Sequence, residues 1–150
     1  MTTTIPYAEL ESLAGTDLGY TGYREVTQEQ VNLFADATDD HQWIHVDPER
    51  ARTGPFGGPI AHGYLSLALV IPFSEELLQV DGVTTKVNYG LDKVRFPSPV
   101  PVGAKVRMGS VVRDVTVVSG GYQLTLDNVV EVEGAAKPAV VATSLFRFYV

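Results

Sequence analysis

The 150-residue chain has the length and composition of one globular domain, and its charge excludes several classes of function. A formal net charge of −7 disfavours a charge-based grip on nucleic acid or on an anionic membrane. The absence of cysteine excludes disulfides, thiolate nucleophiles and zinc–thiolate sites. The longest apolar run, residues 64–73, is too short to span a bilayer, and residues 1–10 lack the pattern of a secretory signal. We therefore expect a soluble, cytoplasmic protein that occupies residues 1–150 as a single domain.

The N-terminal third of the chain predicts short elements separated by turns. Residues 7–14 are expected to form a short helix, and residues 20–26 are rich in strand-forming residue types. Thr27 and Gln30 have the spacing of a capping box, which predicts a helix from this point to about Ala37.

The middle of the chain predicts two further helices. Asp47 and Pro48 provide a cap and a first-turn proline for a short helix through Arg52. From Ala61 the sequence AHGYLSLALVIPFSEELL is apolar nearly all round, which is typical of a buried helix. Pro72 should kink or end this helix, because its ring removes an N–H donor and clashes with the preceding turn.

Beyond residue 82 the pattern changes to strands. Strand-forming stretches occupy residues 83–90, 93–96, 106–118, 122–132 and 140–150. Gly120 and Gly121 indicate a tight hairpin, and alternation along residues 122–132 gives one buried face. Three long sequential strands with short turns predict an antiparallel meander. The fold class is therefore α+β, with a central helix wrapped by a curled antiparallel sheet.

The candidate chemistry lies in residues 38–64, which contain all three histidines. Asp40 and His45 lie between two predicted helices, where an irregular backbone can turn both side chains into one cleft. A carboxylate beside an imidazole provides two groups that exchange protons near neutral pH. The alternative is structural: Asp40 caps a helix end, and His45 is a buried, hydrogen-bonded histidine.

A second candidate is the His62-Gly63 pair at the start of the apolar helix. The first N–H groups of a helix lack internal acceptors and carry the positive end of the dipole, and glycine lets a ligand approach them closely. The Gly63 N–H is therefore a candidate donor to an oxyanion. The alternative is that Gly63 only allows tight packing while His62 caps the helix.

A metal site is not expected. His41 and His45 are four residues apart and lie beside Asp40, but the sequence has no H-E-x-x-H motif. The Asp47-Pro48 pair that follows argues against a helix face shared by the two histidines.

The run FADATDDHQWIHVDPERA, followed by GPFGGPIAHGYL, resembles the signature of MaoC-like (R)-specific enoyl-CoA hydratases. In that family the pattern is approximately D-x-N-P-x-H-x-D, followed by P-I-x-H-G. The later segment VNYGLDKVRFPSPVPVG is also similar to the family's strands, and the match is best with the nodulation-protein-N type. The resemblance implies a hotdog fold, in which a helix lies inside an antiparallel sheet, and a homodimer joined through sheet edges.

The resemblance also implies roles for individual residues. It places the catalytic aspartate on Asp40, the catalytic histidine on His45 and the oxyanion N–H on Gly63. It departs from the family at Gln42-Trp43, where many members have Asn-Pro, and this leaves open which side chain holds the loop. The candidate substrate-binding residues are Trp43, Gly58, Pro59, Ile60, His62 and Arg95. From the sequence alone a core position explains Trp43 better than ligand binding does, and Arg95 either meets phosphates or is solvated.

The function implied is reversible hydration of trans-2-enoyl thioesters to (R)-3-hydroxyacyl thioesters. Asp40 and His45 would hold one water against C3, and the sequence does not say which of them is the base. The substrate would be an acyl-CoA or acyl carrier protein thioester. No cofactor is expected, since coenzyme A is part of the substrate. Two alternatives remain: a hotdog acyl-CoA thioesterase, and a non-catalytic protein that binds acyl thioesters.

Overall fold

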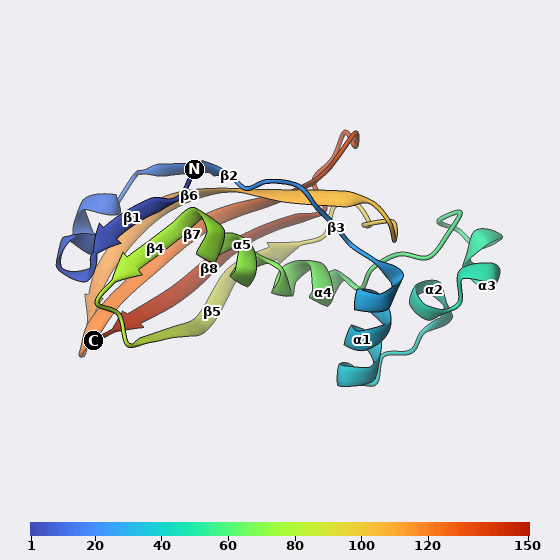
Figure 1. The fold of residues 1–150 in the computed structure, drawn as a ribbon, viewed down its shortest axis with the longest axis horizontal. Helices are drawn as coiled ribbons and strands as arrows, with labels where there is room; N and C mark the ends of the chain where they lie inside the picture. The colour runs from blue at the N-terminus through green and yellow to red at the C-terminus, as the bar shows by residue number, and fades with distance from the viewer.

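The computed structural model describes residues 1–150 and shows a long curved sheet around a kinked helix (Figure 1). The main sheet has six strands in the order β2-β6-β7-β8-β5, with β3 also paired to β6. Its strands are β2 (Asp17–Tyr20), β3 (Arg24–Glu25), β5 (Thr85–Arg95), β6 (Lys105–Val118), β7 (Gly121–Val132) and β8 (Val140–Tyr149). The expected α+β arrangement is confirmed.

The meander predicted for the C-terminal half is also confirmed. Strands β6, β7 and β8 pair antiparallel in sequence order, and the β6–β7 hairpin closes with Val118 opposite Gly121. Gly120 in this hairpin has a φ of 79°, a conformation that glycine adopts without strain. The expected buried face of β7 consists of Leu124, Leu126, Asn128, Val130 and Val132, with Tyr122 half-buried.

The central helix consists of α4 (Gly63–Ala68) and α5 (Val70–Leu77), interrupted at Leu69. Pro72 lies in the first turn of α5, so the break just before it is the predicted kink. The expectation of burial all round is wrong: Tyr64 is 73% exposed, and Ala68 is also exposed. The sheet wraps only one side of the helix, so the opposite apolar side is left open.

Several elements differ from the sequence-based expectation. The N-terminal strand β1 (Thr3–Pro6), which was not predicted, pairs in parallel with β4 (Leu78–Asp81) after the central helix. The short helix expected at residues 7–14 is a 3₁₀ helix, η1 (Tyr7–Leu13). The single strand expected at residues 20–26 is two short strands, β2 and β3. Conversely, the two strands expected at 83–96 are one strand, β5, with two register irregularities.

Three short helices gather at one end of the sheet, beside the N-terminus of α4 (Figure 1). They are α1 (Gln28–Thr38), α2 (Trp43–Val46) and α3 (Pro48–Arg52). The predicted caps are present: Thr27 Oγ1 accepts from the Gln30 N–H at 3.1 Å, and Asp47 Oδ1 accepts from the Arg50 N–H at 3.1 Å. None of the helices is long and apolar enough to cross a membrane.

Candidate active site

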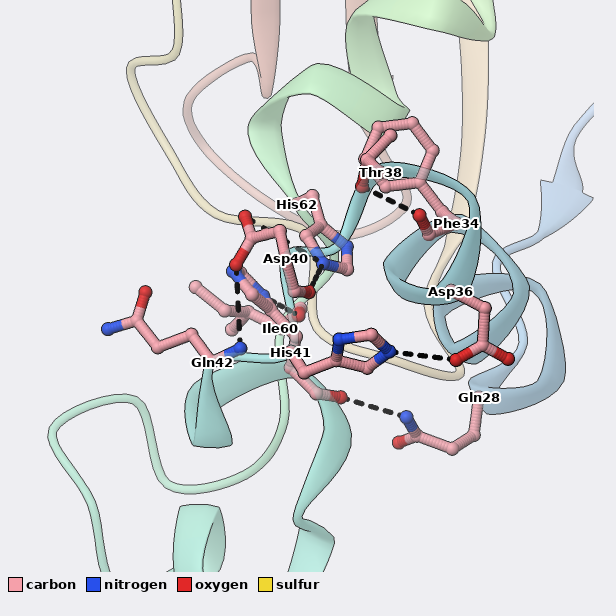
Figure 2. Close-up of polar contacts among 10 residues, drawn as sticks. Gln28, Phe34, Asp36, Thr38, Asp40, His41, Gln42, Ile60 and His62 are labelled. Carbon is pink, nitrogen blue, oxygen red and sulfur yellow. Dashed lines mark hydrogen bonds and ion pairs between the residues drawn. The ribbon is translucent and has the colours of Figure 1, made fainter.

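The chain turns sharply between α1 and α2 and thereby brings Asp40 back toward the start of α4 (Figure 2). Asp39 ends α1 in the left-handed conformation, with a φ of 60°, and is the only non-glycine residue with a positive φ. This conformation is tolerated by aspartate better than by most residues. The irregular backbone expected here is only partly correct, because His45 itself lies on the one-turn helix α2.

His45 is buried and held in a single tautomer by a backbone carbonyl. Its Nδ1 lies 2.6 Å from the Ile60 carbonyl oxygen, which can only accept, so Nδ1 carries the hydrogen. The Nε2 atom is therefore left with its lone pair. Burial lowers the pKa of His45 below the usual 6.5, opposed by the hydrogen bond to Ile60 and by the Asp40 charge. The neutral form, a proton acceptor at Nε2, is favoured.

His62 contacts both the His45 ring and the Asp40 backbone. Its ring is 2% exposed and stacks on His45, with centroids 3.9 Å apart and an interplanar angle of 25°. Its Nε2–H donates to the Asp40 carbonyl at 2.9 Å (Figure 2), whereas its buried Nδ1 has no partner. The side chain makes no cap hydrogen bond to α4, so the capping alternative is wrong. His62 instead fixes the Asp40 backbone and the His45 ring.

The side chains of Asp40 and His45 converge, as the sequence predicted. One carboxylate oxygen of Asp40 and one ring nitrogen from each of His45 and His62 lie within 4.8 Å of one another. The Asp40 side chain is 51% exposed, so water reaches it. Two acceptors at such a separation can both bind one water molecule, with hydrogen bonds of about 2.8 Å each.

The same three side chains are poorly arranged to bind a metal ion. A metal lies in the plane of a coordinating imidazole, about 2.0–2.1 Å from its nitrogen. Stacked rings with centroids 3.9 Å apart direct their in-plane lone pairs side by side and not toward a common point. One nitrogen of each ring is also already bonded to a backbone carbonyl. The geometry suits a hydrogen-bonded pair better than a metal centre.

Gly63 is the first residue of α4, so its N–H has no acceptor within the helix. It lines two neighbouring cavities, of about 300 and 280 Å³, and His45 and Phe96 line both of them. A Cβ atom at Gly63 would lie 3.1 Å from the Phe96 ring, so a side chain here would displace this aromatic wall. Gly63, at the start of α4, and His45 therefore line the same two cavities.

The remaining predicted residues have different surroundings. Ile60 is buried and acts through its carbonyl on His45. Trp43 is half-buried and lies outside the hydrophobic core, so the core alternative is not supported. The carbon of the Arg50 guanidinium lies 4.3 Å from the centre of its ring, which also packs against Gly54.

Gly58 and Pro59 line a separate cavity of about 340 Å³ together with Arg52. Arg95 lies at the end of β5, where it is exposed and donates to the Val94 carbonyl at 2.6 Å.

Sequence reasoning missed the side chain that fastens α2. Gln28 Nε2 donates to the His45 carbonyl at 2.8 Å and to Asn32 Oδ1 at 2.9 Å, which ties α2 to α1. In the absence of the Asn-Pro pair, Gln28 therefore fixes α2, while His62 holds the loop at Asp40. Phe34, whose ring packs 4.8 Å from His62, and Phe96 were also missed. Their positions in sequence carried no signal, because each contact joins separate elements.

Comparison with known proteins identifies the family of the chain. The family described as MaoC like domain matches residues 9–133. The chain belongs to the MaoC-like family. This MaoC-like chain is 54% identical, over 94% of both chains, to 3-hydroxyacyl-thioester dehydratase Z of Mycobacterium tuberculosis. It is 45% identical to nodulation protein N of Rhizobium meliloti, over 92% of this chain and 88% of the relative.

A solved structure confirms the fold. The (R)-hydratase from A. caviae involved in PHA biosynthesis superimposes with a TM-score of 0.70 at 25% identity, covering 89% of this chain and 94% of the other. The hotdog fold implied by the sequence resemblance is therefore confirmed.

Proposed function

We propose that this MaoC-like chain is a hydro-lyase that adds water reversibly to trans-2-enoyl thioesters and forms (R)-3-hydroxyacyl thioesters. The observation that carries the proposal is the convergence of Asp40 and His45 within 4.8 Å beside the free N–H of Gly63. The names of the M. tuberculosis dehydratase and the A. caviae (R)-hydratase support the same reaction class.

In the proposed reaction, Asp40 and His45 hold one water molecule against C3 of the substrate. Neutral His45 can only accept at Nε2, and the Asp40 carboxylate also accepts, so the two bind both hydrogens of the water. One O–H bond breaks as the water oxygen bonds to C3, and the pair takes the proton. The pair then delivers a proton to C2, which completes the addition. Acid–base catalysis of this kind contributes about 10²–10⁴-fold in rate.

The thioester oxygen gains negative charge as C3 is attacked. In our proposal it accepts from the Gly63 N–H, whose position at a helix start favours an anion. Removal of one such donor typically costs about 3–4 kcal/mol of transition-state stabilisation. The carbonyl, the reacting carbons and the water are then held by three neighbouring groups.

The substrate is proposed to be an acyl thioester of CoA or of acyl carrier protein. In this proposal Arg52, which lines a cavity with Gly58 and Pro59, and the exposed Arg95 on β5 offer positive charge for carrier phosphates. In this scheme Ile60, His62 and Trp43 act indirectly, by holding the loop and the His45 ring.

We also propose that the protein is a homodimer joined through β5. This strand is the edge of the main sheet, and Val87, Tyr89 and Leu91 on it are 39%, 55% and 45% exposed. An apolar edge strand of this kind is a natural pairing surface. Light scattering should give twice the chain mass, and Leu91→Asp should shift it toward the monomer. A wild-type monomer at micromolar concentration would contradict the proposal.

The reaction as proposed uses no cofactor beyond the coenzyme A of the substrate. The cytoplasmic location expected from the sequence stays a prediction.

The function is tested with crotonyl-CoA and longer trans-2-enoyl-CoAs. Loss of absorbance at the enoyl conjugation band, with an (R)-3-hydroxyacyl product on chiral analysis, is the expected result. Thiol release without hydration would instead identify a thioesterase. Binding without any turnover would identify an acyl-thioester-binding protein. Either outcome would overturn the proposal.

A further inference from the structure

A further cavity of about 250 Å³ lies along the central helix, between α4–α5 and strands β5 and β8. It begins at Leu67 and Ala68, one helical turn beyond Gly63 and Tyr64 of the catalytic end. Six of its nine lining residues are hydrophobic, which suits an alkyl chain. Its polar lining groups are Asn88 and Ser144.

Ser144 ends a chain of hydrogen bonds across the buried face of the sheet. Ser110 Oγ–H on β6 donates to Asn128 Oδ1 on β7 at 2.8 Å. Asn128 Nδ2 in turn donates to Ser144 Oγ on β8 at 2.9 Å. The three side chains are 2%, 1% and 1% exposed.

One further contact of Asn128 favours this direction of the hydrogen bonds. The Asn128 amide nitrogen also faces the Leu126 carbonyl, at 3.5 Å, and a reversed amide would bring two oxygens together there. Asn128 is therefore the donor to Ser144, and the Ser144 hydroxyl hydrogen has no acceptor in the protein. A buried donor without an acceptor is destabilising. Because Ser144 lines the cavity, an acceptor for its hydroxyl group could come from a molecule bound there.

Two neighbouring groups are also donors. Asn88 enters the same cavity from β5, and Lys86 lies two residues earlier on that strand. The Lys86 Nζ lies 4.7 Å from the centre of the Phe146 ring, which is one wall of the cavity, and donates to Ser74 Oγ at 3.1 Å. No carboxylate lies within 4.0 Å of this ammonium. The cavity is therefore lined mainly by apolar side chains, with Ser144, Asn88 and Lys86 as the polar groups in it or beside it.

We propose that the Ser144 hydroxyl binds an oxygen acceptor on the acyl chain of the substrate. The favoured substrates are then trans-2-enoyl thioesters that carry a hydroxyl, keto or carboxylate oxygen beyond the reacting carbons. This inference rests on the proposed hydratase function and names its substrate class. A site that donates a hydrogen bond to a substrate oxygen discriminates against analogues that lack it.

The test uses two sets of trans-2-enoyl-CoAs of matched chain length, one with plain alkyl ends and one with an oxygen at each distal position in turn. Wild-type enzyme should favour one oxygenated substrate by about tenfold in kcat/KM, the scale of one hydrogen bond. Ser144→Ala should reduce that ratio to near one while turnover of crotonyl-CoA stays unchanged. Thr143→Ala is the matched control, because Thr143 bonds to Asp127 outside this chain of hydrogen bonds and should leave the ratio intact.

A wild-type enzyme that hydrates both sets equally would overturn the inference, as would a ratio that survives Ser144→Ala. Should the alanine variant not fold, Ser144→Cys, with similar volume and a weak donor, gives the same comparison. Failure of the proposed function is a separate result, since it would show as no hydration of any enoyl-CoA, crotonyl-CoA included.

Discussion

The two ends of the central helix are held together in different ways. Around the N-terminus of α4, short helices are fixed by single hydrogen bonds, such as those from Gln28, His45 and His62 to backbone carbonyls. Along α5 and the sheet, the structure consists of long paired strands with a buried apolar face. Changes at the catalytic end should therefore alter chemistry with little loss of stability, and changes in the sheet should do the opposite.

The largest expected effect is on turnover, from changes in the reacting pair. Asp40→Asn and His45→Gln should each lower kcat by about 10²–10⁴-fold, because each removes a proton acceptor. The Asp40 side chain is half-exposed, so Asp40→Asn in particular should leave the fold intact. Steady-state kinetics with crotonyl-CoA, alongside circular dichroism, measures both effects. Near-wild-type kcat in either folded variant would refute the assignment.

The opposite effect, a loss of stability with little change in turnover, is expected from a substitution in the sheet. Leu124 is fully buried on β7, and Leu124→Ala should lower the free energy of unfolding by about 2–5 kcal/mol. The kcat of the folded variant for crotonyl-CoA should remain within about twofold, because the removed atoms lie away from the reacting groups. Urea unfolding and kinetics on the same sample test the contrast. A large loss of kcat without loss of stability would contradict the expected difference between the catalytic end and the sheet.

A smaller effect on turnover is expected at His62. His62→Phe keeps a stacking ring and loses the N–H donated to Asp40, whereas His62→Gln keeps a donor and loses the ring. We expect kcat to fall about 10–100-fold in His62→Phe, the scale of a slightly displaced catalytic group, and to recover partly in His62→Gln. KM should not change. Unchanged kcat in both variants would mean that His62 serves packing alone.

The pH dependence follows from the buried state of His45. Burial lowers the pKa of His45, so the folded protein binds this proton more weakly than the unfolded chain does. Stability from neutral His45 is present above pH 6.5 and is lost as the pH falls from 6.5 toward the lowered pKa. The part of the acid limb of kcat/KM that reports His45 should also lie below pH 6.5, and His45→Gln should remove the corresponding loss of stability. A His45-dependent acid limb above pH 6.5 would contradict this description.

The smallest expected effect is that of a chelator. The stacked rings of His45 and His62 do not aim at a common ion, so dialysis against EDTA should leave kcat unchanged within error. Inactivation by EDTA, reversed by one added metal, would contradict the proposed use of a water held by side chains alone.

Local patterns in the sequence predicted those parts of the fold that depend on neighbouring residues. The Thr27 and Asp47 caps, the hairpin at Gly120 and the alternation along β7 each arise within a few residues. The parallel pairing of β1 with β4 was missed, because it joins segments more than 70 residues apart and leaves no local pattern.

The site, like the fold, was predicted only in part. The resemblance placed Asp40, His45 and Gly63, and the structure brings all three to one space. The donor that fastens α2, Gln28, and the stacking of His62 on His45 could not be predicted, since both depend on how α1, α2 and α4 meet. The open side of the central helix was missed because a uniformly apolar sequence does not say which side the sheet covers.

In the proposed mechanism, Asp40 and His45 together add water to an enoyl thioester. The most direct measurement is the absorbance of the conjugated enoyl group of crotonyl-CoA, followed with wild-type enzyme and with the Asp40→Asn/His45→Gln double variant at equal folded concentration. We predict rapid loss of absorbance with the wild type and none above background with the double variant. Equal rates with both proteins, or no change with the wild type, would contradict the claim.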